Sequence, residues 1–476
     1  MPKIDTAVLF DFEKKIAELS FDGMSLDGSL TTFLRIEFVS GQPEISLRSK
    51  LSAFYSYYRV KYFGDPNIGK YDIANSHIQK GNGILTFISG SRHLFEINYP
   101  VFKKMGAENI HCIIDNRTLL DHFTIKPVFY SFMNELPAIS FTEWRNKFTL
   151  IEAKLNAVIH SFCKEHHLGK FYFFKIKNLL LLYTQRLLSY RVLLTHLNPD
   201  FILVEHDRYI LTSPIINAAK NLNIRTYTSL HGVINDTLGY TPILADKLFA
   251  WGDIQKKKLI TLGAEENKII ISGAAQLQNK TIIAKEDVLI KLGLDAGVKI
   301  ILLATNPLND DLREKYIQIF CEAVTQLPRN KIKGIVRLHP SEDKVLYEKY
   351  KEKFSDIFID TQGFLSYDES LAVTDIVCNF SSAYGIDALI KGKPVIIINI
   401  DDTLLAVGKE MIEKGSIKWV SNSAQLKSIL EVLLISDHHL SNYENYLSVC
   451  KHTSKLFCEV YGDDATDNII HAIQNY

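Results

Sequence analysis

Residues 333–341 read KGIVRLHPS, and residues 375–382 read DIVCNFSS. Each stretch opens with a short apolar run that predicts a buried strand, and each closes with polar side chains. In an open parallel sheet, ligands bind at the carboxyl ends of the strands. The two stretches therefore predict a ligand site lined by His339, Ser381 and Ser382.

Apolar runs of the same kind recur along the chain, with helical patterns between them. They occupy residues 84–88, 110–114, 201–204, 226–230, 247–252, 268–273, 298–305, 357–360 and 394–399. Alternating strands and helices are typical of a parallel sheet covered by helices on both faces. We expect an α/β protein built from two Rossmann-like, doubly wound domains that face a cleft.

The length of the chain, 476 residues, also favours two domains, because single cores rarely grow beyond about 250–300 residues. We expect residues 1–80 to be an extension of the first domain and residues 81–280 to be its Rossmann-like part. Residues 281–440 would form the second domain. Residues 441–476 have a helical pattern and would pack back on the first domain.

The composition argues against nucleic acid as a partner and favours the cytoplasm as the compartment. Lys+Arg and Asp+Glu both number 54, so there is no basic excess of the kind that nucleic-acid binders carry. The six cysteines form no Cys-x-x-Cys pair, which favours reduced thiols in the cytoplasm. No run of about twenty apolar residues predicts a membrane span. The basic, aromatic-rich segment 170–197 leaves open a peripheral contact with the inner membrane.

His339 and the serine pair are the candidates for phosphate binding. Pro340 restrains His339 to an extended backbone, and an imidazole can donate to a phosphate oxygen. Ser381 and Ser382 precede a helical pattern, so they are either N-caps or part of an anion site at the helix N-terminus. Asp387, farther along that helix, either contacts a ribose hydroxyl or is an ordinary solvated residue.

Three residues that follow strands of the first domain are candidates for a general base. His231 ends one apolar run, and Glu205 and Asp207 follow another. An imidazole or a desolvated carboxylate can accept a proton from an acceptor hydroxyl. The sequence does not choose among the three.

A polar loop follows the first strand of this domain. Its residues Ser91, Arg92 and His93 would bind an anionic group of the substrate or acceptor.

Several familiar motifs are absent from the chain. It contains no Asp-x-Asp and no Gly-x-x-x-x-Gly-Lys-[Ser/Thr], and no cluster with the spacing of metal ligands. We therefore expect no metal and no resident cofactor, with protein groups neutralising the phosphate.

Five local patterns together resemble a known family. They are His231-Gly232, Ala245-Asp246 with Trp251-Gly252, Lys268-Ile269 with Gly273, Arg337-x-His339-Pro340, and Ser381-Ser382. In this order they resemble bacterial surface-polysaccharide glycosyltransferases of the GT-B fold. These include capsule and lipopolysaccharide enzymes that use CMP-activated Kdo or sialic acids, and the related CDP-glycerol glycerophosphotransferases. The resemblance covers residues 200–400.

The resemblance implies roles for individual residues. His339, Ser381 and Ser382 would hold the donor nucleotide and its phosphate, and His231 would be the base. The chain also departs from each relative: it lacks the acidic-acidic-Gly motif of sialyltransferases, and Asn379-Phe380 stands where glycerophosphotransferases have aspartate and tyrosine. UDP-N-acetylglucosamine 2-epimerases share the fold, but their run of acids after the second-domain serine is missing.

We therefore expect a metal-independent, cytoplasmic glycosyltransferase. It would bind a nucleotide-sugar donor on the second domain and a glycan or glycolipid acceptor on the first, and move Kdo or a sialic-acid-like nonulosonate from a CMP-sugar onto a surface glycan. The alternatives are a CDP-glycerol-type glycerophosphotransferase, a UDP-sugar transferase and a non-catalytic glycan-binding protein.

Overall fold

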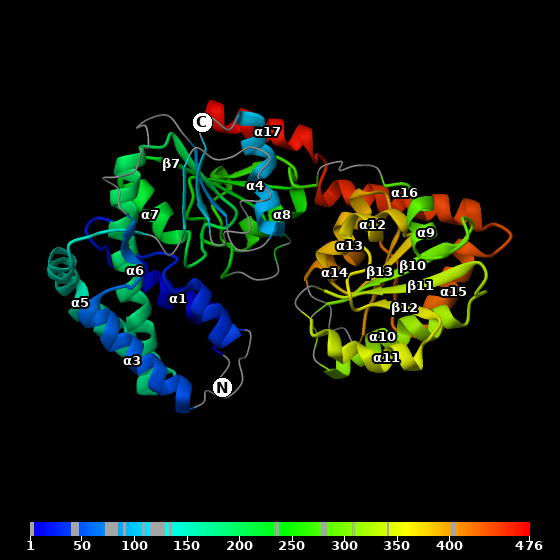
Figure 1. Cartoon of the computed structure of the whole chain (residues 1–476), viewed down its shortest axis with the longest axis horizontal. Coiled ribbons are helices and arrows are strands. Elements are labelled where there is room, and N and C mark those ends of the chain that lie inside the picture. The colour runs from blue at the N-terminus through cyan, green and yellow to red at the C-terminus, as the bar shows by residue number, and fades with distance from the viewer. Residues whose placement is uncertain are drawn as a thin grey trace.

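The computed structural model describes most of the chain. The residues it describes are 4–39, 47–71, 84–88, 92–106, 110–114, 129–132, 136–232, 234, 238–277, 283–306, 308, 310–339, 342–400 and 406–476. Within them the chain forms two large parallel sheets, which Figure 1 shows in separate halves of the molecule.

The first sheet has seven strands in the order β4-β3-β2-β6-β7-β8-β9, all parallel. Its strands are β2 (Ile84–Ile88), β3 (Ile110–Ile114), β4 (Phe129–Phe132), β6 (Phe201–Val204), β7 (Arg225–Ser229), β8 (Lys247–Ala250) and β9 (Ile269–Ile271). A small pair, β1 (Ile68–Tyr71) and β5 (Leu136–Pro137), lies outside this sheet.

The second sheet has six parallel strands in the order β12-β11-β10-β13-β14-β15. They are β10 (Lys299–Ala304), β11 (Ile332–Arg337), β12 (Ile357–Asp360), β13 (Ile376–Asn379), β14 (Val395–Ile398) and β15 (Trp419–Val420). Counted along the chain, the spatial order is 3-2-1-4-5-6, which is the doubly wound order of nucleotide-binding sheets. The predicted α/β class with two Rossmann-like sheets is confirmed.

Helices surround both sheets. In the first half they are α1 (Thr6–Ala17), α2 (Thr31–Leu34), α3 (Leu47–Phe63), α4 (Arg92–Met105), α5 (Phe141–Glu165), α6 (Lys170–Leu197), α7 (Ser213–Asn221) and α8 (Asp253–Thr261). In the second they are α9 (Lys285–Lys291), α10 (Asp310–Thr325), α11 (Glu348–Lys353), α12 (Tyr367–Val373), α13 (Ala383–Ile390), α14 (Ala406–Glu413) and α15 (Ser423–Leu434). Because helices cover both faces, strands such as β13 and β14 are buried along their whole length.

The N-terminal helices join the first domain through one buried arginine. Arg208, which follows β6, is fully buried and donates to the carboxylate of Glu13 on α1 over 2.7 Å. It also donates to the carboxylate of Asp27 and to the backbone carbonyl oxygens of Leu238 and Pro242. Breaking such a buried pair by removing one partner costs roughly 3–5 kcal/mol. The Arg208 network therefore holds α1 against the end of strand β6.

The C-terminal segment belongs to both halves of the molecule. Helix α16 (His439–Phe457) packs against α13 and α15 of the second half and reaches α8 of the first. Helix α17 (Asp463–Asn475) packs against α4 of the first half, as Figure 1 shows. An ion pair between Lys258 on α8 and Glu410 on α14, 3.2 Å long, adds a second link between the halves.

Helix α6 is a core helix of the first domain. Fifteen of its residues are buried. Four of its basic side chains pair with acids from other segments: Lys175 with Glu37, Lys177 with Glu152, Arg186 with Asp65, and Arg191 with Asp22. None of the helices in the described part of the chain has both the length and the apolar composition needed to cross a membrane.

Candidate active site

Two strands of the second sheet, β10 and β13, end in polar residues at the point where the strand order reverses. Thr305 and Asn306 follow β10, and Ser381 lies just beyond β13. The backbone N–H of Ser381 donates to Oδ1 of Asn306 over 3.4 Å, which joins the two strand ends. Sheets of this order bind ligands in the crevice at the reversal point. The structure places Ser381 at that point.

Ser382 caps the N-terminus of α13. Its hydroxyl accepts from the N–H of Tyr384 over 3.3 Å. The carboxamide of Asn379 holds the same turn twice, because its Nδ2 donates to the carbonyl of Ser382 and its Oδ1 accepts from the N–H of Ser382. Gly385 leaves room for this carboxamide, since a Cβ there would lie 2.1 Å from Nδ2. The positive end of the α13 dipole is thereby fixed at the strand ends, where it attracts anions.

His339 follows β11, and its backbone is hydrogen-bonded to a residue that follows β10. Its backbone N–H donates to Oγ1 of Thr305 over 2.9 Å and to the carboxylate of Glu342 over 3.1 Å. Glu342 is itself held by the hydroxyls of Thr305 and Tyr347. Partial burial lowers the pKa of His339, and the nearby carboxylate of Glu342 opposes that shift. A neutral imidazole at this place can donate one hydrogen bond.

Asp387 lies one turn into α13 and already has a partner. Its carboxylate accepts from the hydroxyl of Tyr367, which begins α12. The guanidinium of Arg337 lies over the ring of Tyr367 at 5.6 Å and over the ring of Tyr384 at 6.0 Å. The predicted contact between Asp387 and a ribose hydroxyl remains a prediction, and the structure adds Tyr367 and Arg337 to its surroundings.

In the first domain, His231 follows β7 and makes two polar contacts through its ring. Nδ1 lies 3.1 Å from the carbonyl oxygen of Glu205, and Nε2 lies 3.3 Å from the hydroxyl of Tyr240. A backbone carbonyl only accepts, so Nδ1 carries the proton and Nε2 is the acceptor nitrogen. The indole of Trp251 donates to the carbonyl of Leu230 over 3.1 Å and so braces the end of the strand. This geometry leaves His231 with a basic nitrogen at Nε2.

His206 stacks on His231. The ring centroids lie 4.9 Å apart with an interplanar angle of 25°, and the ring of Tyr240 stacks on both imidazoles. Desolvation lowers the pKa of His206 to well below the ordinary value of 6.5, and the neighbouring His231 and the Arg35 and Arg208 cations add to the shift. His206 therefore stays neutral at neutral pH.

The two carboxylates predicted beside His231 differ in their surroundings. Asp207 is buried, and its carboxylate accepts from the N–H groups of Leu244 and Ala245 over 2.6 and 2.9 Å. Those bonds hold the segment before β8. Glu205 is buried as well, and its backbone carbonyl orients His231. Thus the carboxylate of Asp207 accepts from two backbone N–H groups, whereas Nε2 of His231 faces the hydroxyl of Tyr240.

Part of the predicted acceptor loop lies outside the described residues. Ser91 is one of them, and for Arg92 and His93 the structure describes only the backbone, at the start of α4. Their role in binding an acceptor stays a prediction. Pro340 and Ser341, which follow His339, also lie outside the described residues.

The other motif residues of the resemblance have packing roles. The carboxylate of Asp246 accepts from both the N–H and the hydroxyl of Thr226 at 2.8 Å. A Cβ on Gly252 would lie 2.6 Å from the carbonyl oxygen of Phe457, and one on Gly273 would lie 2.1 Å from that of Val460. These glycines let the C-terminal segment cross from one half of the molecule to the other.

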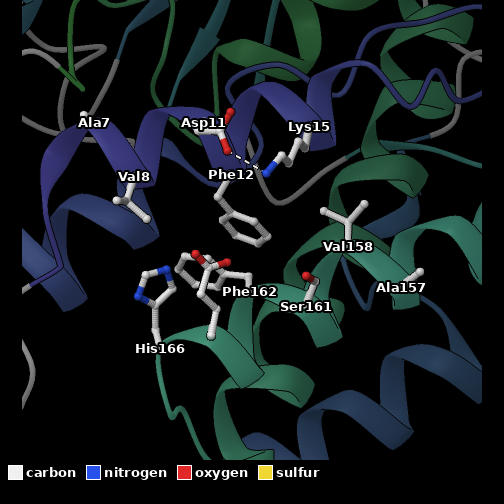
Figure 2. Close-up of a pocket in the computed structure, with 11 residues that line it drawn as sticks. Ala7, Val8, Asp11, Phe12, Lys15, Ala157, Val158, Ser161, Phe162 and His166 are labelled. Atoms are coloured by element: carbon white, nitrogen blue, oxygen red, sulfur yellow. Dashed lines mark ion pairs between the residues drawn. The ribbon is translucent and has the colours of Figure 1, made fainter.

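No cluster of His, Cys, Asp and Glu that could hold a metal occurs within the described residues. A surface groove of about 530 Å³ lies between α1 and α5. Figure 2 shows the Phe12 and Phe162 side chains and the Asp11–Lys15 ion pair along it. None of the residues predicted from the sequence lines this groove.

Four further residues belong with the predicted ones: Thr305, Asn306, Glu342 and Tyr240. Thr305 and Asn306 lie at the end of an apolar run in the sequence, so the rule that ligands bind at strand ends could have identified them. Glu342 and Tyr240 lie in loops, and only the folded structure brings them to His339 and His231.

No protein-family profile matches the sequence, and comparison with curated proteins gives no match either. Solved structures do match over most of the chain. A Staphylococcus aureus MnaA structure determined with UDP has a TM-score of 0.52 and 15% identity, and the match covers 83% of this chain and 96% of that one.

Two other solved structures match over a similar share of the chain. A putative UDP-N-acetylglucosamine 2-epimerase from Listeria monocytogenes gives a TM-score of 0.54 at 16% identity, covering 83% of this chain and 96% of that one. A glycosyltransferase from Rickettsia africae gives 0.52 at 16% identity, covering 84% and 99%. At such identities the likeness establishes the fold, which is the predicted GT-B arrangement.

Proposed function

We propose that this chain is a glycosyltransferase that uses a UDP-activated sugar. The second domain would hold the nucleotide diphosphate, and the first would deprotonate the acceptor hydroxyl. The observation that carries this proposal is the meeting of three strand ends in the second sheet. There Thr305 holds the backbone of His339, and Asn306 holds that of Ser381.

The diphosphate would lie at the N-terminus of α13. The hydroxyls of Ser381 and Ser382 would donate to it there, and the helix dipole adds a positive potential. The imidazole of His339 would donate a further hydrogen bond to a phosphate oxygen. Because the sequence has no Asp-x-Asp motif, these protein groups are proposed to stabilise the leaving diphosphate.

His231 is proposed as the general base. Its Nε2 would accept the proton of the acceptor hydroxyl while that oxygen forms a bond to C1 of the sugar. The bond between C1 and the diphosphate oxygen would break, and UDP would leave with the electron pair. The proton on Nδ1, donated to the carbonyl of Glu205, would keep the ring in the required tautomer and orientation.

UDP is the favoured nucleotide because a protein of similar fold was solved with it. The local motifs indicate a CMP-sugar, but none of the three similar structures described above is described as containing one. The acceptor is proposed to be a glycan or a glycolipid, as the resemblance implies.

UDP-N-acetylglucosamine 2-epimerase is the second candidate, because the similar Listeria structure carries that description. Against it stands the sequence after Ser382: residues 383–390 contain a single acid, Asp387, where epimerases have a run of them. The transferase is therefore preferred.

Product analysis separates the two candidates. The full chain is incubated with UDP-N-acetylglucosamine and UDP-glucose, and the products are followed by NMR. Release of UDP with free sugar, water serving as a slow acceptor, supports the transferase, whereas conversion to the C2 epimer supports the epimerase. CDP-glycerol and a CMP-sugar serve as comparison substrates. Turnover of one of these two alone would contradict the UDP assignment.

A further inference from the structure

The outer face of α3 carries a row of exposed aromatic side chains. Tyr55, Tyr58 and Tyr62 are 71%, 44% and 60% exposed, and Phe63 is 84% exposed. The spacing of three and four residues places the tyrosines on one side of the helix. We call Tyr55, Tyr58, Tyr62 and Phe63 the aromatic face. In the described part of the chain ten aromatic side chains are exposed, and four of them lie on this helix. Such a concentration of exposed apolar surface is typical of an interaction site.

The opposite side of α3 is firmly packed. Tyr57 and Val60 are buried, and the ring of Phe54 lies 4.2 Å from that of Phe174 on α6. Tyr58 stacks on Tyr62 with an interplanar angle of 8°. The aromatic face is therefore held rigidly by the core of the first domain, and Figure 1 shows α3 at the edge of that half.

Charge distinguishes α3 from its neighbour α6. Residues 47–63 contain four basic residues and no acid. Arg59, on the exposed side, pairs with no carboxylate in the described part of the chain, and Lys61 lies over the rings of Tyr57 and Tyr62. Glu152, the nearby acid, is already paired with Lys177 and Arg145. Thus Arg59 gives the exposed side of α3 a positive charge with no acidic partner, whereas four of the cations of α6 are paired with acids.

We propose that the aromatic face and the basic residues of α3 dock the protein on an anionic lipid bilayer. Tyrosine and phenylalanine suit the headgroup region, where an apolar ring can enter the membrane while polar groups stay in water. Lysine and arginine beside them are attracted to anionic lipid phosphates. Pairing of two copies through this face is disfavoured, because it would bring two helices of like charge together.

Vesicle sedimentation of the full chain tests this surface without using turnover. One set of vesicles is phosphatidylcholine alone, and the other mixes phosphatidylcholine with phosphatidylglycerol. The aromatic variant combines Tyr55→Ser, Tyr62→Ser and Phe63→Ser, and the charge variant combines Arg59→Gln with Lys61→Gln. Matched controls in the second domain are Trp419→Ser and the pair Lys414→Gln with Lys451→Gln, all exposed positions. Circular dichroism confirms that each variant is folded.

The expected result is salt-sensitive binding to the anionic vesicles and weak binding to phosphatidylcholine. Each charge removed should weaken binding about fivefold, so the charge variant, which loses two charges, should bind about 25-fold more weakly. The aromatic variant should also bind weakly, and the controls should bind as the unmodified chain does. Equal binding by all variants would overturn the proposal. The absence of vesicle binding would also overturn it. A dimer that sedimentation equilibrium detects and the aromatic variant abolishes, without vesicle binding, would show that the face pairs two copies of the chain instead.

Discussion

Nδ1 of His231 lies 3.1 Å from the carbonyl oxygen of Glu205, and this contact fixes which nitrogen of His231 can act as a base. The carbonyl accepts the Nδ1 proton, so Nε2 is left to accept. The hydroxyl of Tyr240, 3.3 Å from Nε2, marks the direction from which a substrate hydroxyl would approach. The end of strand β6 thereby orients a residue at the end of β7.

Replacing His231 tests its role as a base. His231→Gln should lower kcat by about 10²–10⁴-fold, the usual contribution of a general base, with little change in the KM for the sugar nucleotide. Tyr240→Phe keeps the stack with His231 and should have a much smaller effect on kcat. Steady-state kinetics with the substrate identified by product analysis makes the measurement. An unchanged kcat in His231→Gln would remove His231 from the mechanism.

Ser382 allows binding to be separated from stability. Ser382→Asp keeps an N-cap that can accept from the N–H of Tyr384, and a carboxylate at a helix N-terminus favours the helix. The same charge would repel a diphosphate. We expect thermal stability to be preserved while UDP affinity falls by about tenfold or more, as loss of a charge-assisted hydrogen bond predicts. Ser382→Asn is the matched uncharged cap. If both variants bind UDP alike, no phosphate lies beside this residue.

The pKa of His206 predicts how stability depends on pH. In the folded protein this pKa lies well below 6.5, whereas the unfolded chain takes up a proton near 6.5. Below pH 6.5 the unfolded state therefore binds more protons, and stability falls as the pH falls. The contribution approaches about 1.4 kcal/mol per pH unit. His206→Asn can retain an acceptor for the N–H of Arg208, and urea unfolding between neutral and mildly acidic pH should show a shallower slope in that variant. Equal slopes would mean that His206 is protonated in the folded state.

Gly273 and Gly263 form a matched pair of glycines with positive φ, +89° and +94°. An added Cβ meets nothing within 4 Å at Gly263, but it meets the carbonyl oxygen of Val460 at 2.1 Å at Gly273. Gly263→Ala should cost about 1–2 kcal/mol of unfolding free energy from backbone strain alone. Gly273→Ala should cost clearly more, because the segment between α16 and α17 must move. Equal losses in urea unfolding would show that this crossing is not tightly packed.

The sequence predicted the second domain well because buried parallel strands leave continuous apolar runs, and polar residues mark where they end. His339 and Ser381 were singled out in this way, and their roles stay predictions. Asn306 also follows an apolar run, but its proximity to Ser381 depends on β10 lying beside β13, and strand order is not written in local sequence. Tyr240 is a loop residue whose place beside His231 depends on tertiary packing.

Tertiary structure also decides which charges of the chain are paired. Residues 170–197 contain basic residues and no acid, which drew attention to this segment as a membrane contact. In the structure, acids from four other segments pair with Lys175, Lys177, Arg186 and Arg191, and fifteen residues of the helix are buried. On α3, which packs against α6, Arg59 has no such partner among the described residues.

The central claim is that the second domain holds a nucleotide diphosphate where β10, β11 and β13 end. Isothermal titration of UDP, CMP and GDP into the full chain tests it most directly. The account predicts saturable binding of UDP with one site per chain, tighter than that of CMP or GDP. The absence of binding by all three nucleotides would contradict it.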